Sequence, residues 1–231
     1  MANIVLVHGL WSDGSSWAKV ITELRAMGHT PVAAQLSLET FDDDVASVRR
    51  TLATVEGPVL LVGWSYGGAV IGEAARGVEA VKALAYIAAF APAEGESVSG
   101  LSRKYPGSLI SAHVVVAGEY TYIDRDYFGD VLAADALPED VAVAAATQRM
   151  VRIGVDRVKV GSPAWLDLPS HYWVSAEDLC VPPVLQREMA ERMGAAITEV
   201  ASSHAPLLSR PREVAEFLDA ACRDLPDAND S

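Results

Sequence analysis

The chain has 231 residues, of which 51% are hydrophobic and 21% charged, a composition typical of one globular domain rather than a disordered or fibrous protein. It carries 31 acidic and 18 basic side chains, a formal net charge of −13, so nucleic acids and anionic membrane surfaces are disfavoured as partners. The two cysteines, Cys180 and Cys222, suit neither a disulfide framework nor a zinc motif, and the expected location is the reducing cytoplasm.

The predicted elements alternate between strands and helices over the first 88 residues. A run of Ile, Val and Leu at residues 4–7 indicates a strand buried on both faces, and we expect no export signal before it. The elements expected next are a helix from Ser15 or Ser16 to Gly28, a strand over 31–34, a helix over 42–55, a strand over 58–62, a helix over 66–76 and a strand over 81–88. This order predicts an α/β fold: a mostly parallel sheet of about six strands with helices on both faces.

The alternation breaks after Pro92. The segment 93–169 contains an expected hairpin, 113–116 with 120–123, and a helix that begins at Pro138. We interpret this segment as a small cap inserted into a single domain that spans 1–231. The elements expected after it are a strand over 171–174, a helix over 183–193, a strand over 196–200, a helix over 211–222 and a polar tail over 224–231.

The pentapeptide Gly63-Trp64-Ser65-Tyr66-Gly67 matches the pattern G-x-S-x-G between a predicted strand and a predicted helix. A tight strand-to-helix turn projects the serine hydroxyl from the sheet, and the two glycines avoid a steric collision there. The helix N-terminus also places the backbone N–H of Tyr66 where it can stabilise an oxyanion. Ser65 is therefore the predicted nucleophile, although an ordinary serine in a glycine-rich turn would give the same pentapeptide.

A serine nucleophile needs a base, and the base needs an acid that orients it. His204 lies in the loop after the last predicted strand and is the expected general base. Glu177 and Asp178 follow the preceding strand, and we favour Asp178 because it stands four residues before Pro182, in a pattern that is part of the family resemblance described below. Glu177 and the more remote Glu94 are the alternatives. Ligands of parallel α/β sheets bind at the carboxyl ends of the strands, where these loops meet.

The loop after the first strand, His8-Gly9-Leu10-Trp11, is the expected source of a second oxyanion donor. Gly9 lets the backbone turn so that the Leu10 N–H faces the serine, and Leu10 and Tyr66 together form the predicted oxyanion hole. His8 is expected to brace this loop. Trp11 and Trp64 are predicted to border the substrate pocket, although large aromatic side chains beside glycines are also common in cores.

These features resemble the α/β-hydrolase superfamily. The resemblance is carried by His8-Gly9, by Gly63 to Gly68, by Asp178 before Val181-Pro182, and by the sequence Ser203-His204-Ala205-Pro206-Leu207-Leu208-Ser209. The short cap and this last motif are similar to the compact branch of bacterial esterases, plant methylesterases and hydroxynitrile lyases. The resemblance implies a catalytic triad in the order Ser65, Asp178, His204 and no cofactor. In those lyases a lysine follows the catalytic histidine, whereas Ala205 stands here, which disfavours a lyase.

The leading hypothesis is a serine hydrolase that cleaves a small, largely apolar carboxylic ester through an acyl-enzyme. Its pocket is expected to draw on aromatic residues of the insertion, which equally fit the cap's own core: Tyr105, Tyr120, Tyr122, Tyr127, Phe128 and Trp165. The same residues would serve a thioester, lactone or carbon–carbon bond hydrolase, or a ligand-sensing receptor with little turnover. The natural substrate and the oligomeric state do not follow from the sequence.

Overall fold

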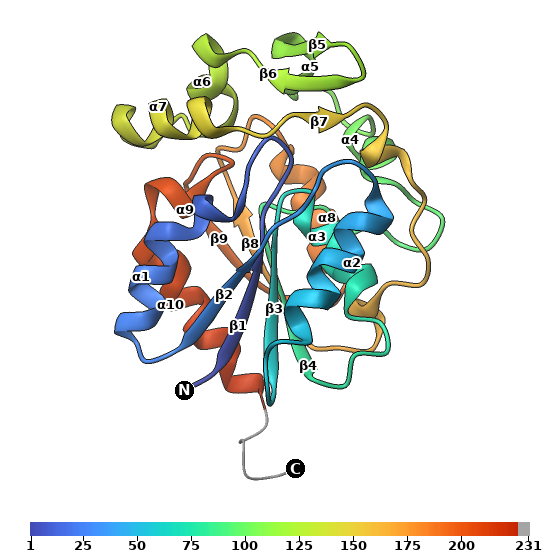
Figure 1. The fold of residues 1–231 in the computed structure, drawn as a ribbon, viewed down its shortest axis with the longest axis vertical. Helices are drawn as coiled ribbons and strands as arrows, with labels where there is room; N and C mark the ends of the chain where they lie inside the picture. The colour runs from blue at the N-terminus through green and yellow to red at the C-terminus, as the bar shows by residue number, and fades with distance from the viewer. Residues whose placement is uncertain (226–231) are drawn as a thin grey trace.

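The central sheet has six parallel strands in the order β2-β1-β3-β4-β8-β9 (Figure 1). The computed structural model describes residues 1–225, so most of the predicted polar tail lies outside the described residues. The strands are β1 (Asn3–Val7), β2 (Thr30–Ala34), β3 (Val59–Trp64), β4 (Val81–Ile87), β8 (Ser170–Ser175) and β9 (Ala196–Val200). Every residue of β3 is buried, as expected for an apolar strand covered on both faces. The predicted sheet is confirmed.

Helices cover both faces of this sheet (Figure 1). On one face α1 (Ala18–Ala26) packs against α10 (Pro211–Ala221), and α9 (Pro206–Ser209) precedes α10. On the other face lie α2 (Phe41–Leu52), α3 (Gly67–Ala74) and α8 (Pro183–Arg192). No helix within residues 1–225 has the length and apolar character needed to cross a membrane.

The first helix begins differently from the prediction. Asp13, rather than Ser15 or Ser16, caps a short 3-10 turn (Gly14–Trp17) that precedes α1, and its Oδ1 accepts a hydrogen bond from the Ser15 N–H at 2.7 Å. The Ser15 hydroxyl donates to Asp13 Oδ1 at 2.5 Å and the Ser16 hydroxyl to the Asp13 carbonyl oxygen at 2.7 Å, so both serine side chains bind back to Asp13 instead of capping α1. In α2 the cap is Thr40, whose Oγ1 accepts from the Asp43 N–H at 3.1 Å.

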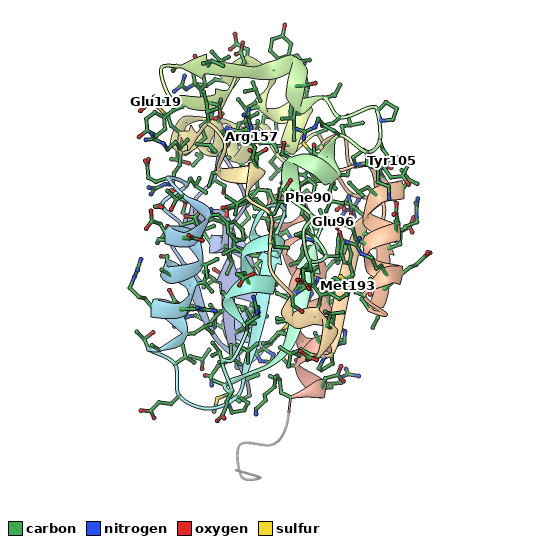
Figure 2. The ribbon with its side chains drawn as sticks, turned by 90° about the vertical axis from the view of Figure 1, so that its right-hand side faces the viewer. Phe90, Glu96, Tyr105, Glu119, Arg157 and Met193 are labelled. Carbon is green, nitrogen blue, oxygen red and sulfur yellow. The ribbon has the colours of Figure 1, made fainter. Side chains whose placement is uncertain are left out.

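The segment between β4 and β8 carries a second sheet, β5-β6-β7, above the carboxyl ends of the central strands (Figure 1). The predicted hairpin is confirmed as the antiparallel pair β5 (Val114–Ala117) and β6 (Tyr120–Ile123), and β7 (Val151–Arg152) adds to β6. The helices of this segment are α4 (Val98–Ser102), α5 (Ile110–His113), α6 (Phe128–Leu132) and α7 (Pro138–Thr147). The helix predicted from Pro138 is thus α7. Figure 2 shows Glu119, in the β5–β6 turn, well above Phe90, which follows β4.

Candidate active site

Ser65, His204 and Asp178 lie in hydrogen-bonding contact beyond the ends of β3, β9 and β8. The distance from His204 Nε2 to Ser65 Oγ is 2.9 Å, and the distance from His204 Nδ1 to Asp178 Oδ2 is 2.7 Å. When a hydroxyl, an imidazole and a carboxylate are hydrogen-bonded in this order, the hydroxyl proton can move to the imidazole ring while the carboxylate holds the ring in place. We refer to these three residues as the Ser–His–Asp cluster.

The turn that presents Ser65 is strained and closely packed. Ser65 has a φ of 56°, in the left-handed region that residues other than glycine seldom adopt. Its carbonyl accepts hydrogen bonds from the Gly68 N–H at 3.1 Å and the Phe90 N–H at 3.0 Å. A Cβ atom on Gly67 would lie 2.6 Å from the Val7 carbonyl oxygen, so the turn needs glycine at this position. These surroundings hold the serine in a conformation that it would not keep alone.

We expect Gly67→Ala to lower the free energy of unfolding by about 1–3 kcal/mol, because the added methyl group meets backbone that cannot move aside. Gly72→Ala is the matched control in the same helix, since its Cβ would have no neighbour closer than 3.6 Å. Alanine at a helical position whose surroundings admit the methyl group at ordinary contact distance should stabilise by up to about 1 kcal/mol. Urea denaturation of both variants measures the difference, and equal stabilities would contradict the close approach at Gly67.

Asp178, rather than Glu177 or Glu94, is the acid that contacts His204. Its side chain is buried, whereas both glutamates are exposed. Asp178 Oδ1 accepts from the backbone N–H groups of Cys180 at 2.7 Å and Val181 at 2.9 Å. These donors fix the carboxylate so that Oδ2 is directed at the imidazole.

Gln186 is a member of this site that the sequence did not predict. It is fully buried in α8, and its Nε2 donates to Asp178 Oδ2 at 2.7 Å. Its Oε1 accepts from the Ser175 N–H at 2.9 Å, which ties the amide to the end of β8. A glutamine on a helix is ordinarily exposed, so nothing in its local sequence indicates this role.

His8 braces the loop after β1, as predicted. Its Nε2 accepts a hydrogen bond from the Leu36 N–H at 3.0 Å, so the ring hydrogen resides on Nδ1, which donates to the Gly9 carbonyl oxygen at 2.9 Å. Burial lowers the pKa of His8 to about 4. The imidazole is therefore neutral at physiological pH and serves as a fixed two-ended link.

This low pKa predicts an acid-sensitive contribution to stability. The unfolded chain binds a proton on His8 below about pH 6.5, whereas the folded chain binds it only below about pH 4, so acidification between these values favours unfolding. Between pH 7.5 and pH 4 the wild type should lose about 3 kcal/mol more unfolding free energy than His8→Gln, which cannot titrate there. Urea denaturation at both pH values measures this, and parallel losses would contradict it.

The two predicted oxyanion donors flank Ser65. Tyr66 follows it in the chain, and the loop that contains Leu10 passes so close that a Cβ on Gly9 would lie 2.8 Å from Ser65 Cβ. Within residues 1–225, the backbone N–H groups of Leu10 and Tyr66 donate to no protein acceptor. Neither N–H group is therefore occupied by a protein acceptor in the described part of the chain, as the predicted oxyanion hole requires.

A mostly apolar cavity of about 180 Å³ lies between the loops at the carboxyl end of the central sheet and the inserted segment. Trp11, Trp64 and Ala205 are among its lining residues; Ser65 and His204 are not, although they are the chain neighbours of Trp64 and Ala205, so the cavity lies beside the Ser–His–Asp cluster. Trp64 Nε1 donates to the His204 carbonyl oxygen at 2.7 Å, and Trp11 Nε1 donates to Thr121 Oγ1 of β6 at 3.2 Å. The two tryptophans singled out in the sequence thus both border this cavity.

Of the aromatic residues of the insertion considered for the pocket, Phe128 is the one that lines this cavity. The others face elsewhere: the Tyr105 hydroxyl donates to Glu188, the Tyr120 hydroxyl to Glu39, and the Trp165 Nε1 to the Pro92 carbonyl oxygen, while Tyr122 packs on Arg125 and Tyr127 stacks on His113. The insertion contributes instead the aliphatic residues Leu132, Val143 and Ala144 of α6 and α7, together with the polar residues Asp140, Thr147 and Gln148. A sequence position inside the insertion does not determine which way its side chain faces.

One group of potential metal ligands occurs within residues 1–225, formed by Asp178, Cys180 and His204, whose donor atoms lie within 4.8 Å of one another. The carboxylate and the imidazole are already hydrogen-bonded to each other, and burial raises the pKa of the Cys180 thiol well above its usual range. Since a thiol must be deprotonated to bind a metal, this arrangement suits the Ser–His–Asp cluster better than a metal.

The sequence profile of the alpha/beta hydrolase family matches residues 4–217. The chain belongs to this family. It is 27% identical over 237 residues to the alpha/beta hydrolase nvfD of Aspergillus novofumigatus, and the aligned region covers 93% of this chain and 94% of that protein. It is 34% identical over 139 residues to the carbendazim hydrolyzing esterase of a Nocardioides species, over 54% of this chain and 57% of that protein. The solved structure of a pyrethroid hydrolase from Sphingobium faniae JZ-2 has a TM-score of 0.82 at 23% identity, covering 95% of this chain and 96% of that one. The α/β-hydrolase fold expected from the sequence is confirmed.

Proposed function

We propose that this protein is a serine hydrolase that cleaves small, largely apolar carboxylic esters. The observation that carries the proposal is the pair of contacts from His204, at 2.9 Å to the Ser65 hydroxyl and at 2.7 Å to the Asp178 carboxylate. Membership of the alpha/beta hydrolase family supports it, and so does the likeness to proteins named as an esterase and a pyrethroid hydrolase.

In the proposed reaction, Ser65 Oγ attacks the acyl carbon while His204 Nε2 takes the hydroxyl proton. Asp178 holds the Nδ1–H and stabilises the imidazolium. The oxyanion of the tetrahedral intermediate accepts hydrogen bonds from the Leu10 and Tyr66 N–H groups, each contributing about 2.7–4 kcal/mol to transition-state stabilisation. His204 then protonates the departing alcohol. Water attacks the acyl-enzyme by the same route, with His204 again as base, and releases the acid.

The cavity between the two parts of the molecule is the proposed substrate pocket, with Trp11 and Trp64 as substrate-binding residues. Its volume of about 180 Å³ suits a short acyl or single-ring group rather than a long chain. We propose that the region 93–169 acts as the cap over this pocket, within a single domain. The proposed reaction uses side chains and backbone groups of this chain together with water, and none of its steps calls for a cofactor.

Turnover of p-nitrophenyl acetate, butyrate and octanoate tests this function. We expect repeated turnover and a kcat/KM at least about 10-fold lower for octanoate than for butyrate, because the cavity cannot enclose the longer chain. A thioester and a lactone of similar size establish whether the ester is the preferred bond. A single burst, stoichiometric with the protein, would instead indicate a ligand sensor that acylates without turning over.

A further inference from the structure

Asp44 is a fully buried carboxylate outside the Ser–His–Asp cluster. Its Oδ1 accepts hydrogen bonds from the Leu38 N–H at 2.9 Å and from Ser37 Oγ at 3.2 Å, and its Oδ2 accepts from the Tyr66 hydroxyl at 2.9 Å. Burial raises the pKa of Asp44. A buried acid is costly to stability, and this one is satisfied by three donors rather than by a cation.

Tyr66 connects this carboxylate to the candidate oxyanion hole. The same residue presents its hydroxyl to Asp44 and its backbone N–H beside Ser65. Its side chain is 0% exposed, and the ring packs edge-on against Phe41 at 6.1 Å between centroids. Because the ring is enclosed and its hydroxyl is anchored, the Cα–Cβ bond of Tyr66 has a fixed direction. The backbone nitrogen is bonded to the same Cα, so its N–H is held in place as well.

Residues 36–38, in the loop between β2 and α2, also fasten the other candidate donor. The Leu36 N–H donates to His8 Nε2 at 3.0 Å, and His8 stands two residues before Leu10 in the chain. Leu38 has a φ of 60°, a strained conformation that the hydrogen bond from its N–H to Asp44 helps to maintain. One loop is thus linked by buried hydrogen bonds to both sides of the candidate oxyanion hole.

Building on the proposed function, we propose that Asp44 is a positioning residue for ester hydrolysis: through the Tyr66 hydroxyl it holds the Tyr66 backbone N–H in the orientation that stabilises the tetrahedral oxyanion. Its contribution belongs to the transition state, because a hole aligned with an oxyanion binds the planar ground-state ester less well.

Tyr66→Phe and Asp44→Asn test this inference, because each breaks the anchor and keeps the backbone N–H. We expect kcat for p-nitrophenyl butyrate and the rate constant for inactivation by a fluorophosphonate each to fall about 10-fold, with KM changed less than 2-fold. The pH midpoint of kcat/KM should stay unchanged, since the base is untouched. The double variant should lose no more than the worse single variant, since the two residues act through one bond. Rates are compared well below the Tm of each variant.

Two control variants separate positioning from loss of stability. Tyr86→Phe removes a buried tyrosine hydroxyl that has no hydrogen-bond partner within residues 1–225, and Thr40→Ala removes the cap of the helix that carries Asp44. Tyr86→Phe should leave the rates unchanged, and Thr40→Ala should lower the Tm without lowering kcat. Wild-type rates in Tyr66→Phe, or an equal rate loss in Thr40→Ala, would overturn the inference. Failure of the wild type to turn over esters or to react at Ser65 would instead contradict the proposed function on which it rests.

Discussion

Ser65→Ala is expected to lower kcat for ester hydrolysis by about 10⁶-fold, the loss typical of removing the nucleophile from a group of three residues that acts as a unit. The hydroxyl is the atom that forms the acyl bond, and neither His204 nor Asp178 can replace it. The variant should fold, because alanine adopts the φ of 56° no less readily than serine does. Steady-state kinetics with p-nitrophenyl butyrate measure the loss, and circular dichroism checks the fold.

A fluorophosphonate probe gives a second readout of the same residue. Mass spectrometry should find the wild type modified at Ser65 alone and Ser65→Ala unmodified. Ser203 provides a matched control, because it is buried directly before His204 and, within residues 1–225, its Oγ makes one long contact, 3.5 Å to the Leu132 carbonyl oxygen. Ser203→Ala should keep activity within a few-fold of the wild type. More than about 1% residual activity in Ser65→Ala would place the nucleophile elsewhere.

The sheet and the positions of Ser65 and His204 could be predicted because their signals are local. A parallel strand covered on both faces is an uninterrupted apolar run, as in residues 4–7 and 59–62. The glycines around Ser65 are needed because the turn leaves no room for a Cβ at their positions, and this requirement is a property of the turn itself. His204 follows from its place after the last strand, because the carboxyl ends of parallel strands meet at one edge.

The remaining features depend on contacts between distant parts of the chain. Gln186 and Asp44 are polar residues on helices, and only the packed structure shows that both are buried against the site. The direction of the aromatic side chains in the insertion is set by partners such as Glu188 and Glu39, more than 80 positions away. Hydrophobic periodicity carries no information about such partners.

The choice between Glu177 and Asp178 shows the same limit, because two adjacent carboxylates in one loop have nearly the same local signal. We expect Asp178→Asn to lower kcat/KM by about 10⁴-fold and Glu177→Gln to change it less than 2-fold. Glu177 is exposed, whereas Asp178 contacts His204 directly. Kinetics of both variants with one ester give the ranking, and the opposite ranking would transfer the role of the acid to Glu177.

The hydrogen bonds around Asp178 explain why a nearly isosteric amide should be so damaging. An amide nitrogen in place of Oδ1 would face the Cys180 and Val181 N–H groups. All three groups are donors, so both hydrogen bonds to this atom would be lost. In place of Oδ2, the NH₂ group would face His204 Nδ1 and require that nitrogen to accept. The ring hydrogen would then move to Nε2, the atom that must take the proton of Ser65, and the base would be blocked although the serine is intact. Fluorophosphonate inactivation, which needs the same proton transfer, should therefore slow in parallel with ester turnover, and normal inactivation of a turnover-deficient Asp178→Asn would contradict this explanation.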